Sequence, residues 1–463
     1  MEKQSPKLPW INDALRISML VFALLRAINF FYVSVPLQAV SACIMLAVMI
    51  VSLPKLNKMT RNVILVMLGI GVVLMAVSGA TAKQWLIALL KNGNLVMLLT
   101  MAPLLSAPFF YEDYQSELKT LAQVKMQNLI PFLVLLSIAS HFLGILVSIG
   151  AVIIVYDLLH PFGKLYNAEN EFVTTITRSY SSSGFWSPAW ASVIVYSAYP
   201  NVHWIKVVPV AILFAVIFNA VSIGSFAFKV RKNPERYPRL TPPEGAKVNT
   251  KKIVTMIVLF LGMIGTIIFI DAVTDWDLML VVPAAAITFP LIAALVQNKW
   301  PAYGRGIGNY YNKSLMKIPM QVALYAAAGF LGKAMDISGV GALIPKLLPA
   351  AFTSFPPLMI ISIVLMMVLP ALVGIHPVAT GTAMVAALVP SALGLTDYTF
   401  CLAILFGWIM GVMISPFSSQ TLILAGDTGR SNLDISIGSN WKFCLFCTVL
   451  FAFLISWIGP MMG

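Results

Sequence analysis

Long apolar runs separated by short polar connectors dominate the chain. A helix that crosses a bilayer needs about 20 mostly apolar residues, whereas the strands of a membrane barrel show short alternating segments. The runs here are long and do not alternate, so they predict an all-α polytopic membrane protein. They cover residues 14–33, 35–53, 62–79, 85–108, 129–156, 204–228, 253–270, 278–297, 318–335, 356–373, 399–417 and 442–460.

Composition agrees with this pattern. Of the 463 residues, 59% are hydrophobic and 10% are charged, whereas roughly a quarter of the residues in soluble proteins are charged. Residues 1–12 are polar and the first apolar run leads directly into a second. We therefore expect the N-terminus to be retained rather than removed as a signal peptide.

The net charge of +13 is concentrated in connectors. Residues 229–252 carry eight basic and two acidic side chains, and residues 298–317 carry four basic side chains and no acid. The short connector 271–277 carries three aspartates. By the positive-inside rule, the two basic loops are cytoplasmic and the acidic connector is outside. We therefore interpret the charge as orienting a protein of the cell inner (plasma) membrane toward anionic lipid, and we expect no nucleic-acid partner.

The basic connector separates two halves with the same order of features. Each half has an apolar run, a break rich in small polar residues, a short apolar segment ending near Pro, and a helix with polar interruptions. The predicted division is 1–61 (N-terminal helices), 62–228 (first repeat, hairpin tip near 178–184), 229–252 (connector), 253–426 (second repeat, tip near 374–382) and 427–463 (C-terminal segment and helix).

Each half contains a predicted re-entrant hairpin. In "GIHPVATGTAMVAALVP" (374–390), Gly374 ends one helix and Pro377 begins the next, because Gly tolerates the terminal turn and Pro fits a first helical turn. Thr380 and Thr382 are then expected on the first turn of the return helix, where unpaired N–H groups attract an anion. The equivalent tip of the first half comprises Ser181, Ser182, Ser183 and Gly184.

The helix after each tip carries the second part of each predicted site. Paired interruptions in two halves are typical of a transporter binding site near the bilayer midplane. An alternative stays open, because Gly is common in membrane helices and Ser or Thr often bonds back to its own helix. The candidates are Asn219 and Ser222 in the first half, and Ser415, Ser418, Ser419, Gln420 and Thr421 in the second.

In this succession of hairpin tip, return helix and "SPFSSQT"-type break, the chain resembles the ion transporter superfamily, most closely the divalent anion:sodium symporters. The resemblance covers about 85–228 and 318–426. It implies inverted repeats, a dimerisation scaffold, a moving transport domain and an elevator mechanism. It also implies that the hairpin tips bind substrate and sodium through a Ser-Asn-Thr motif. Ser182-Ser183-Gly184 and Val378-Ala379-Thr380 occupy those positions here, so the Asn is absent from both.

Two ionisable side chains lie near the breaks. Arg178 precedes the serine cluster by three residues, and a charged residue near a membrane-embedded break is a candidate for function. Alternatively, it extends to the lipid head groups. His376 is either a proton-linked or substrate-contacting group, or a neutral imidazole bonded to a helix end.

These features predict a secondary active transporter of a small anionic solute, and the resemblance implies a carboxylate-type substrate, coupling to Na⁺ or H⁺, and a homodimer. We expect no other cofactor, no metal centre and no enzymatic activity, since the chain has no H-E-x-x-H or G-x-S-x-G motif. A flippase for a lipid-linked phosphate is the alternative. The sequence is compatible with two topologies, which differ in how residues 129–156 are counted. If they cross the membrane fully, both hairpins enter from the outside. If they form half of a hairpin, the connector 229–252 lies outside.

Overall fold

The computed structural model describes residues 9–56, 58–147, 149–197, 199, 202–241, 247–340, 352 and 354–462, and most of these residues are helical. No strand occurs in that part of the chain. Ten of its helices are long and apolar enough to cross a membrane. The chain is therefore an all-α, multi-pass membrane protein, as its apolar runs predict.

The helices form two compact units that do not follow the order of the chain. Unit 1 takes its described residues from 1–111, 266–346 and 382–388. Unit 2 takes its described residues from 112–265, 347–381 and 389–463. Each unit therefore draws segments from both predicted halves.

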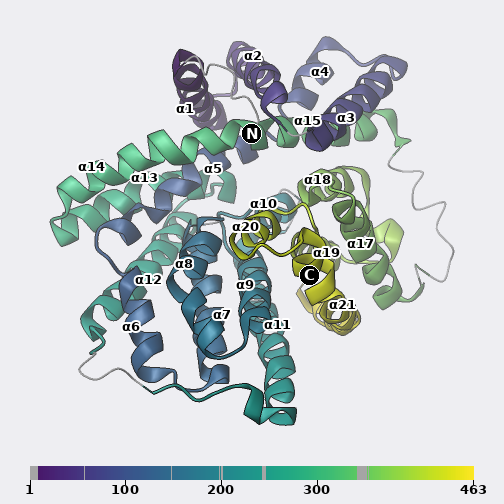
Figure 1. Ribbon diagram of the computed structural model, residues 1–463. Helices are drawn as coiled ribbons and strands as arrows, with labels where there is room; N and C mark the ends of the chain where they lie inside the picture. The colour runs from purple at the N-terminus through teal and green to yellow at the C-terminus, as the bar shows by residue number, and fades with distance from the viewer. Residues whose placement is uncertain are drawn as a thin grey trace. The chain divides into compact units, whose positions relative to one another are not determined.

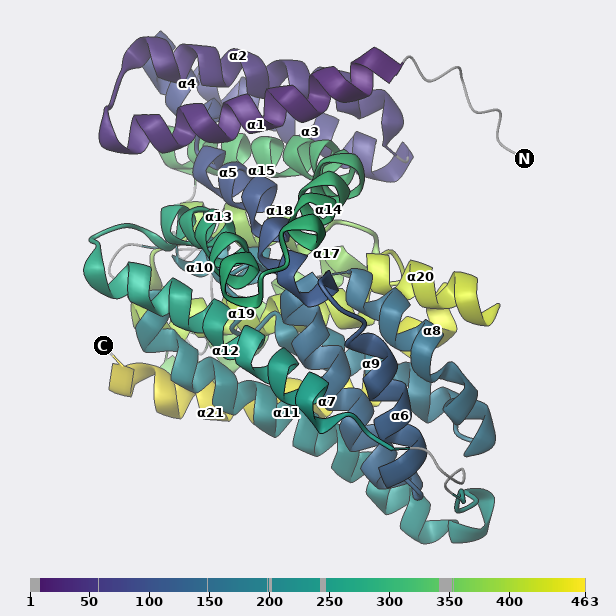
Figure 2. The same cartoon turned by 90° about the vertical axis from the view of Figure 1, so that its left-hand side faces the viewer.

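Unit 1 is built around helix α15 (Ile318–Ser338), which packs against α2, α3 and α4. Helix α1 packs against α2 and α5, and the purple α1 and α2 lie side by side in Figure 2. The other elements of this unit are α1 (Pro9–Phe31), α2 (Val35–Ser52), η1 (Leu53–Lys55), α3 (Lys58–Val77), α4 (Ala82–Leu89), α5 (Gly93–Met101), η2 (Ala102–Phe110), the second part of α12 (Thr250–Val273), α13 (Leu278–Gln297), α14 (Trp300–Asn309), η4 (Tyr310–Ser314), η5 (Leu315–Lys317) and the last part of α18 (Pro377–Ala387).

Unit 2 contains the first predicted hairpin tip, and the second as far as Gly381. Its elements are α6 (Gln115–Lys125), α7 (Leu129–Val147), α8 (Gly150–Leu165), α9 (Glu169–Ser183), α10 (Ala191–Ser197), α11 (Trp204–Lys232), η3 (Pro234–Arg236), the first part of α12, α17 (Pro356–Leu372), the start of α18 (Pro377–Ala387), η8 (Pro390–Leu393), α19 (Asp397–Ile414), α20 (Ser419–Thr428), η9 (Asp434–Gly438), α21 (Ser439–Ile458) and η10 (Gly459–Met462).

Close helix packing holds unit 2 together. Helix α9 packs against α7, α8 and α11, and these helices stand next to one another in Figure 1. Every residue of α19 from Tyr398 to Ile414 is buried, mainly against α17 and α21. At Gly407 an added Cβ would lie 3.2 Å from the Cα of Val364. Small residues let two membrane helices approach this closely, which explains why α17 and α19 make such extensive contact.

The turn between α17 and α18 has the predicted form. Gly374 has a φ of +87°, a left-handed conformation that glycine adopts at little cost. The N–H of Ile375 bonds the carbonyl of Pro370 at 2.9 Å, and Pro377 is the first residue of α18. The two helices are therefore joined by a tight turn of four residues.

Three predicted boundaries are wrong. The apolar run 129–156 is divided between α7 and α8, and the predicted loop 298–317 is helical in α14, η4 and η5. The predicted interruption in 205–228 is absent, because α11 runs unbroken from Trp204 to Lys232. Its polar residues fit a continuous helix: Asn219 donates to the carbonyl of Ala215 at 2.8 Å, a bond within the helix.

Candidate functional site

The first hairpin tip and the second helix break meet inside unit 2. Gln420, the second residue of α20, donates from Nε2 to Oγ of Ser181 at 2.9 Å and to the carbonyl of Val412 at 3.2 Å. Ser181 lies in the last turn of α9, and both side chains are buried. Two segments that are 239 residues apart are thus joined by a direct side-chain contact.

The break between α19 and α20 is satisfied by its own hydroxyl groups. Ser418 is the N-cap of α20, and its Oγ accepts from the N–H of Thr421 at 3.4 Å. The Thr421 hydroxyl donates to the carbonyl of Ser415 at 3.0 Å. Ser415 in turn donates to the carbonyl of Ala371, at the end of α17, at 2.6 Å. Through Ser415, the break is therefore hydrogen-bonded directly to the second hairpin. Ser419, by contrast, is exposed.

The second tip uses its polar groups in different ways. Nδ1 of His376 accepts from the N–H of Val378 at 3.1 Å, so this nitrogen carries no proton and the imidazole bonds a helix end. Thr380 bonds back to the carbonyl of Pro377 at 3.1 Å. Thr382 is the sixth residue of α18 and lies in its second turn, so its predicted first-turn position is wrong. Its buried hydroxyl has no hydrogen-bond partner among the described residues.

A chain of buried polar groups supports the first tip. Trp186 Nε1 donates to Nε2 of His141 at 3.0 Å, which leaves the imidazole proton on Nδ1, 2.7 Å from Oγ of Ser182. Asn219 donates to the same Oγ at 2.8 Å. The hydroxyls of Ser182 and Ser183 bond back to carbonyls of α9 at 2.7 and 2.6 Å. The alternative of back-bonded hydroxyls thus holds for these two serines, but Ser181 contacts Gln420.

Packing fixes the position of the first tip. A Cβ added at Gly184 would lie 2.6 Å from the Trp190 ring and 2.8 Å from Cδ1 of Ile409. The close approach of these two side chains leaves room for glycine only. Glycine is therefore required here by the lack of space for a side chain. Its backbone conformation is not the reason, because the φ of Gly184 is an ordinary −70°.

Arg178 is a buried cation held by neutral groups. Its Nε donates to Oδ1 of Asn440 at 2.9 Å and its Nη2 donates to the carbonyl of Ser439 at 3.1 Å. Its Nη1 lies 3.4 Å from Oγ of Ser222, and its guanidinium carbon lies 3.9 Å from the centre of the Phe443 ring. The side chain is only 5% exposed, so the alternative of an arginine that extends to the head groups is wrong.

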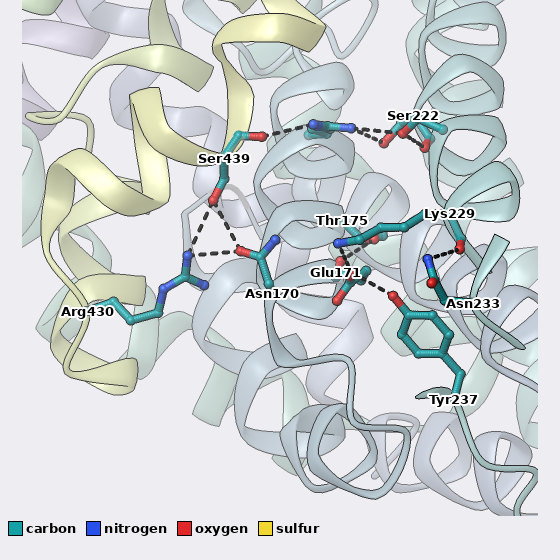
Figure 3. A network of polar contacts seen from close by, with 11 residues as sticks. Asn170, Glu171, Thr175, Ser222, Lys229, Asn233, Tyr237, Arg430 and Ser439 are labelled. Atoms are coloured by element: carbon teal, nitrogen blue, oxygen red, sulfur yellow. Dashed lines mark hydrogen bonds and ion pairs between the residues drawn. The ribbon is translucent and has the colours of Figure 1, made fainter. Parts of the chain in front are cut away.

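Ser439 connects Arg178 to a more exposed cluster. Figure 3 shows the side chains of Arg430 and Asn170 directed at the Ser439 hydroxyl, with distances of 3.3 Å to Nη2 and 3.3 Å to Oδ1. Arg430 is also paired with Asp434 at 2.7 Å. The charge of Arg430 is therefore neutralised by a carboxylate.

Glu171, two helical turns before Arg178, has its own partners. Lys229 of α11 and the Tyr237 hydroxyl both donate to its Oε1, and Figure 3 shows the carboxylate between them. Burial by itself raises the pKa of Glu171, but the hydrogen bonds from Lys229 and Tyr237 reverse that effect, so its pKa lies below the ordinary value. The carboxylate is therefore occupied near the connector and is not paired with Arg178.

The structure brings together most of the predicted site residues and adds others. Ser181, Gln420, Ser415, Ser418 and Thr421 form one contiguous set, and Ser182 and Asn219 form a second with His141. Arg178 and Ser222 form a third set with Asn440 and Ser439. His141, Ser439 and Asn440 are not among the residues predicted from the sequence. His141 is the only ionisable residue of α7, and "SIGSNW" (436–441) is a polar break at the start of an apolar run; both signals were present in the sequence.

No protein-family model matches the chain, and no curated protein matches it. The site consists of hydroxyls, amides, helix ends, one guanidinium and the imidazoles of His141 and His376. Such groups can bind and release a small ion through hydrogen bonds and partial charges. Among the described residues, no three His, Cys, Asp or Glu side chains gather in a way that would hold a metal ion.

Proposed function

We propose that this protein is a secondary active transporter that carries a small organic anion across the membrane together with Na⁺ or H⁺. The contact between Ser181 and Gln420 carries the proposal. It joins a hairpin tip from the first half of the chain to a helix break from the second half, inside one compact unit. Helix ends from two halves of a chain that meet at one place are typical of the central sites of transporters.

Helix polarity at this contact suits two ions of opposite sign. Ser181 lies at the C-terminal end of α9, which carries a partial negative charge, and Gln420 lies at the N-terminal end of α20, which carries a partial positive charge. A cation is stabilised near the first helix end and an anion near the second. One site of this kind can therefore couple the binding of an anion to that of a cation.

The composition of the two units supports an elevator mechanism. All predicted site residues except Thr382 belong to unit 2, and each unit draws on both halves of the chain. In this proposal unit 2 is the transport domain that moves as a rigid body, and unit 1 is the scaffold through which two copies form a homodimer. Rigid-body movement of one domain against another is an established way to change the exposure of a site.

Uptake into proteoliposomes tests the proposal. A panel of radiolabelled mono- and dicarboxylates is offered under an inward gradient of Na⁺, of H⁺ or of neither. We expect gradient-dependent uptake of at least one carboxylate, and at least a tenfold loss with Gln420→Ala. The matched control is Leu422→Ala, a change at an exposed side chain of the same helix, which should leave uptake unchanged.

A second assay addresses the alternative function. The same vesicles are prepared with a fluorescent lipid phosphate, and its movement between leaflets is followed by quenching from outside. Lipid movement that depends on Gln420, with no uptake of any carboxylate, would replace the transporter proposal with the flippase. If the Gln420→Ala protein is as active as the wild-type protein in both assays, the contact between Ser181 and Gln420 takes part in neither function.

A further inference from the structure

A pocket of about 640 Å³ opens beside Arg178, between α9, α11 and α21 of unit 2. Arg178, Val221 and Ser225 line one part of it, and the first residues of α21 line the other. Sites for small molecules in proteins commonly have volumes of 300–1,000 Å³, with mostly apolar walls and a few polar groups that fix orientation. The pocket has the size and the composition of such a site.

Arg178 brings a positive charge to this pocket that no carboxylate of the described residues neutralises. The ion pairs found among the described residues do not include Arg178, although the neighbouring cation Arg430 has Asp434. Burying a charge without a counter-charge is costly, and neutral partners compensate only in part. A buried, uncompensated guanidinium that lines an open pocket is therefore suited to an anion that arrives from outside the protein.

The existing partners leave part of the guanidinium available. The bonds of Nε to Asn440 and of Nη2 to Ser439 have ordinary lengths, but Nη1 lies 3.4 Å from Ser222 and 3.5 Å from Ser225. These two distances are at the outer limit for a hydrogen bond. An anionic oxygen placed near Nη1 would form a stronger, charge-assisted bond than either hydroxyl does.

Apolar and aromatic side chains line the pocket beside the polar residues Ser225, Ser439 and Lys442. Phe443 lies under the guanidinium, and Trp441 and Phe446 are 48% and 57% exposed. Val221 adds an aliphatic surface from α11. The other cation at the pocket is Lys442, which is exposed and lies 5.4 Å from the centre of the Trp441 ring. One buried cation surrounded by apolar surface favours a ligand with one charged group and an apolar body.

We infer that this pocket binds a singly charged organic anion, such as an aromatic or branched-chain carboxylate, with its charged group at Nη1 of Arg178 and its body against Phe443, Phe446 and Val221. The inference rests on the proposed anion transport and specifies the class of substrate. It favours one charged group over two, because Arg178 is the one buried cation at the pocket, whereas Lys442 is exposed and lies over the Trp441 ring. The same chemistry is offered by a lipid with a single phosphate, so the test includes both sources.

Binding is measured on the full-length protein in nanodiscs of phosphatidylcholine, with radiolabelled phenylacetate as the probe. Unlabelled competitors are isovalerate, the neutral analogue phenylacetamide, succinate, and phosphatidate incorporated into the nanodisc. We expect isovalerate to displace the probe and phenylacetamide and succinate to compete at least tenfold more weakly. Displacement by phosphatidate and not by isovalerate would assign the pocket to a lipid source of the same chemistry.

Two variants address the pocket in different ways. Arg178→Gln removes the charge, and Val221→Trp fills the pocket while leaving Arg178 and its partners in place. Each should weaken probe binding at least tenfold, with unchanged elution of the protein in size-exclusion chromatography. The matched control is Arg430→Gln, since Arg430 contacts the same Ser439 but does not line the pocket; its affinity should stay within twofold.

Several outcomes would overturn the inference: succinate binding as tightly as phenylacetate, unchanged binding in both Arg178→Gln and Val221→Trp, or no binding of carboxylate or phosphatidate. The proposed function fails separately. Probe binding without gradient-driven uptake would contradict transport and leave the pocket assignment standing. Uptake of succinate that depends on Gln420, without binding of phenylacetate, would contradict the pocket assignment and leave transport standing.

Discussion

Nε of Arg178 donates a 2.9 Å hydrogen bond to Oδ1 of Asn440, across 262 residues of sequence. The Asn440 amide nitrogen donates to the carbonyls of Ile435 and Ser436 at 2.9 and 3.0 Å. These two bonds fix which end of the amide faces the arginine. Asn440 therefore links the buried cation of α9 to the π-helical segment that precedes α21.

Loss of this link should be measurable as a loss of stability. Asn440→Ala leaves Nε of Arg178 buried without an acceptor, and a hydrogen bond to a charged group contributes about 1.5–3 kcal/mol. We expect the Asn440→Ala protein in nanodiscs to unfold at a lower temperature, with a decrease that corresponds to this loss of free energy. Thr448→Ala, a buried polar substitution farther along α21, is the control. Equal unfolding temperatures for Asn440→Ala and the unchanged protein would contradict the assigned role.

Some helix ends could be predicted from the sequence because the residues that cause them lie at the helix end itself. The turn at Gly374 needs a positive φ and a Pro at the start of the next helix, and both residue types are visible in the sequence. The break at 415–418 likewise contains its own N-cap, Ser418. Features whose cause lies within a few residues are predictable from those residues.

Other features depend on partners that are distant in the sequence. Asn219 and Ser222 look like an interruption of 205–228, but they face polar groups of α9, so α11 continues through them. An isolated stretch of sequence does not show whether a polar residue breaks a helix or meets a polar neighbour. The same reason explains why Ser439 and Asn440 were not recognised as partners of Arg178.

The unpartnered hydroxyl of Thr382 provides a selective test of the second hairpin. Thr382→Val replaces it with a methyl group of similar shape and breaks no hydrogen bond among the described residues. Stability should be retained or raised by about 1 kcal/mol, because a buried unsatisfied hydroxyl is costly. If the hydroxyl contacts substrate or the coupling ion, uptake should fall at least tenfold in this stable protein. Unchanged uptake would exclude Thr382 from the site.

The pair formed by Glu171 and Lys229 predicts a pH dependence of stability. The folded state lowers the pKa of Glu171 below its ordinary value of 4.5. Its stabilising contribution is therefore fully present above pH 4.5 and is lost as the pH falls through the lower pKa of the folded state. Unfolding temperatures measured between pH 3 and 7 should fall toward the acid end. The Glu171→Gln protein should unfold at a lower temperature at pH 7, and its unfolding temperature should depend less on pH. The same pH dependence in both proteins would show that other groups cause it.

The final prediction concerns the side of the connector, which decides between the two topologies. The structure divides 129–156 into α7 and α8, and counting this stretch as half of a hairpin would place 229–252 outside. Charge argues for the opposite side, since eight basic residues oppose two acidic ones there. Because retention of basic loops in the cytoplasm sets the orientation of membrane proteins, we expect the connector inside.

Single cysteines at exposed positions can decide this in a Cys43→Ala background, which removes an exposed natural thiol. Glu235→Cys in the connector and Asn309→Cys at the end of α14 should react with an impermeant thiol reagent only in inside-out vesicles. Asp275→Cys, between α12 and α13, should react only in right-side-out vesicles; all three positions are exposed. Since α12 alone separates Glu235 from Asp275, the two must label from opposite sides if α12 crosses the membrane. Labelling of Glu235→Cys from outside would reverse the assignment of the connector and would favour the topology in which 129–156 is half of a hairpin.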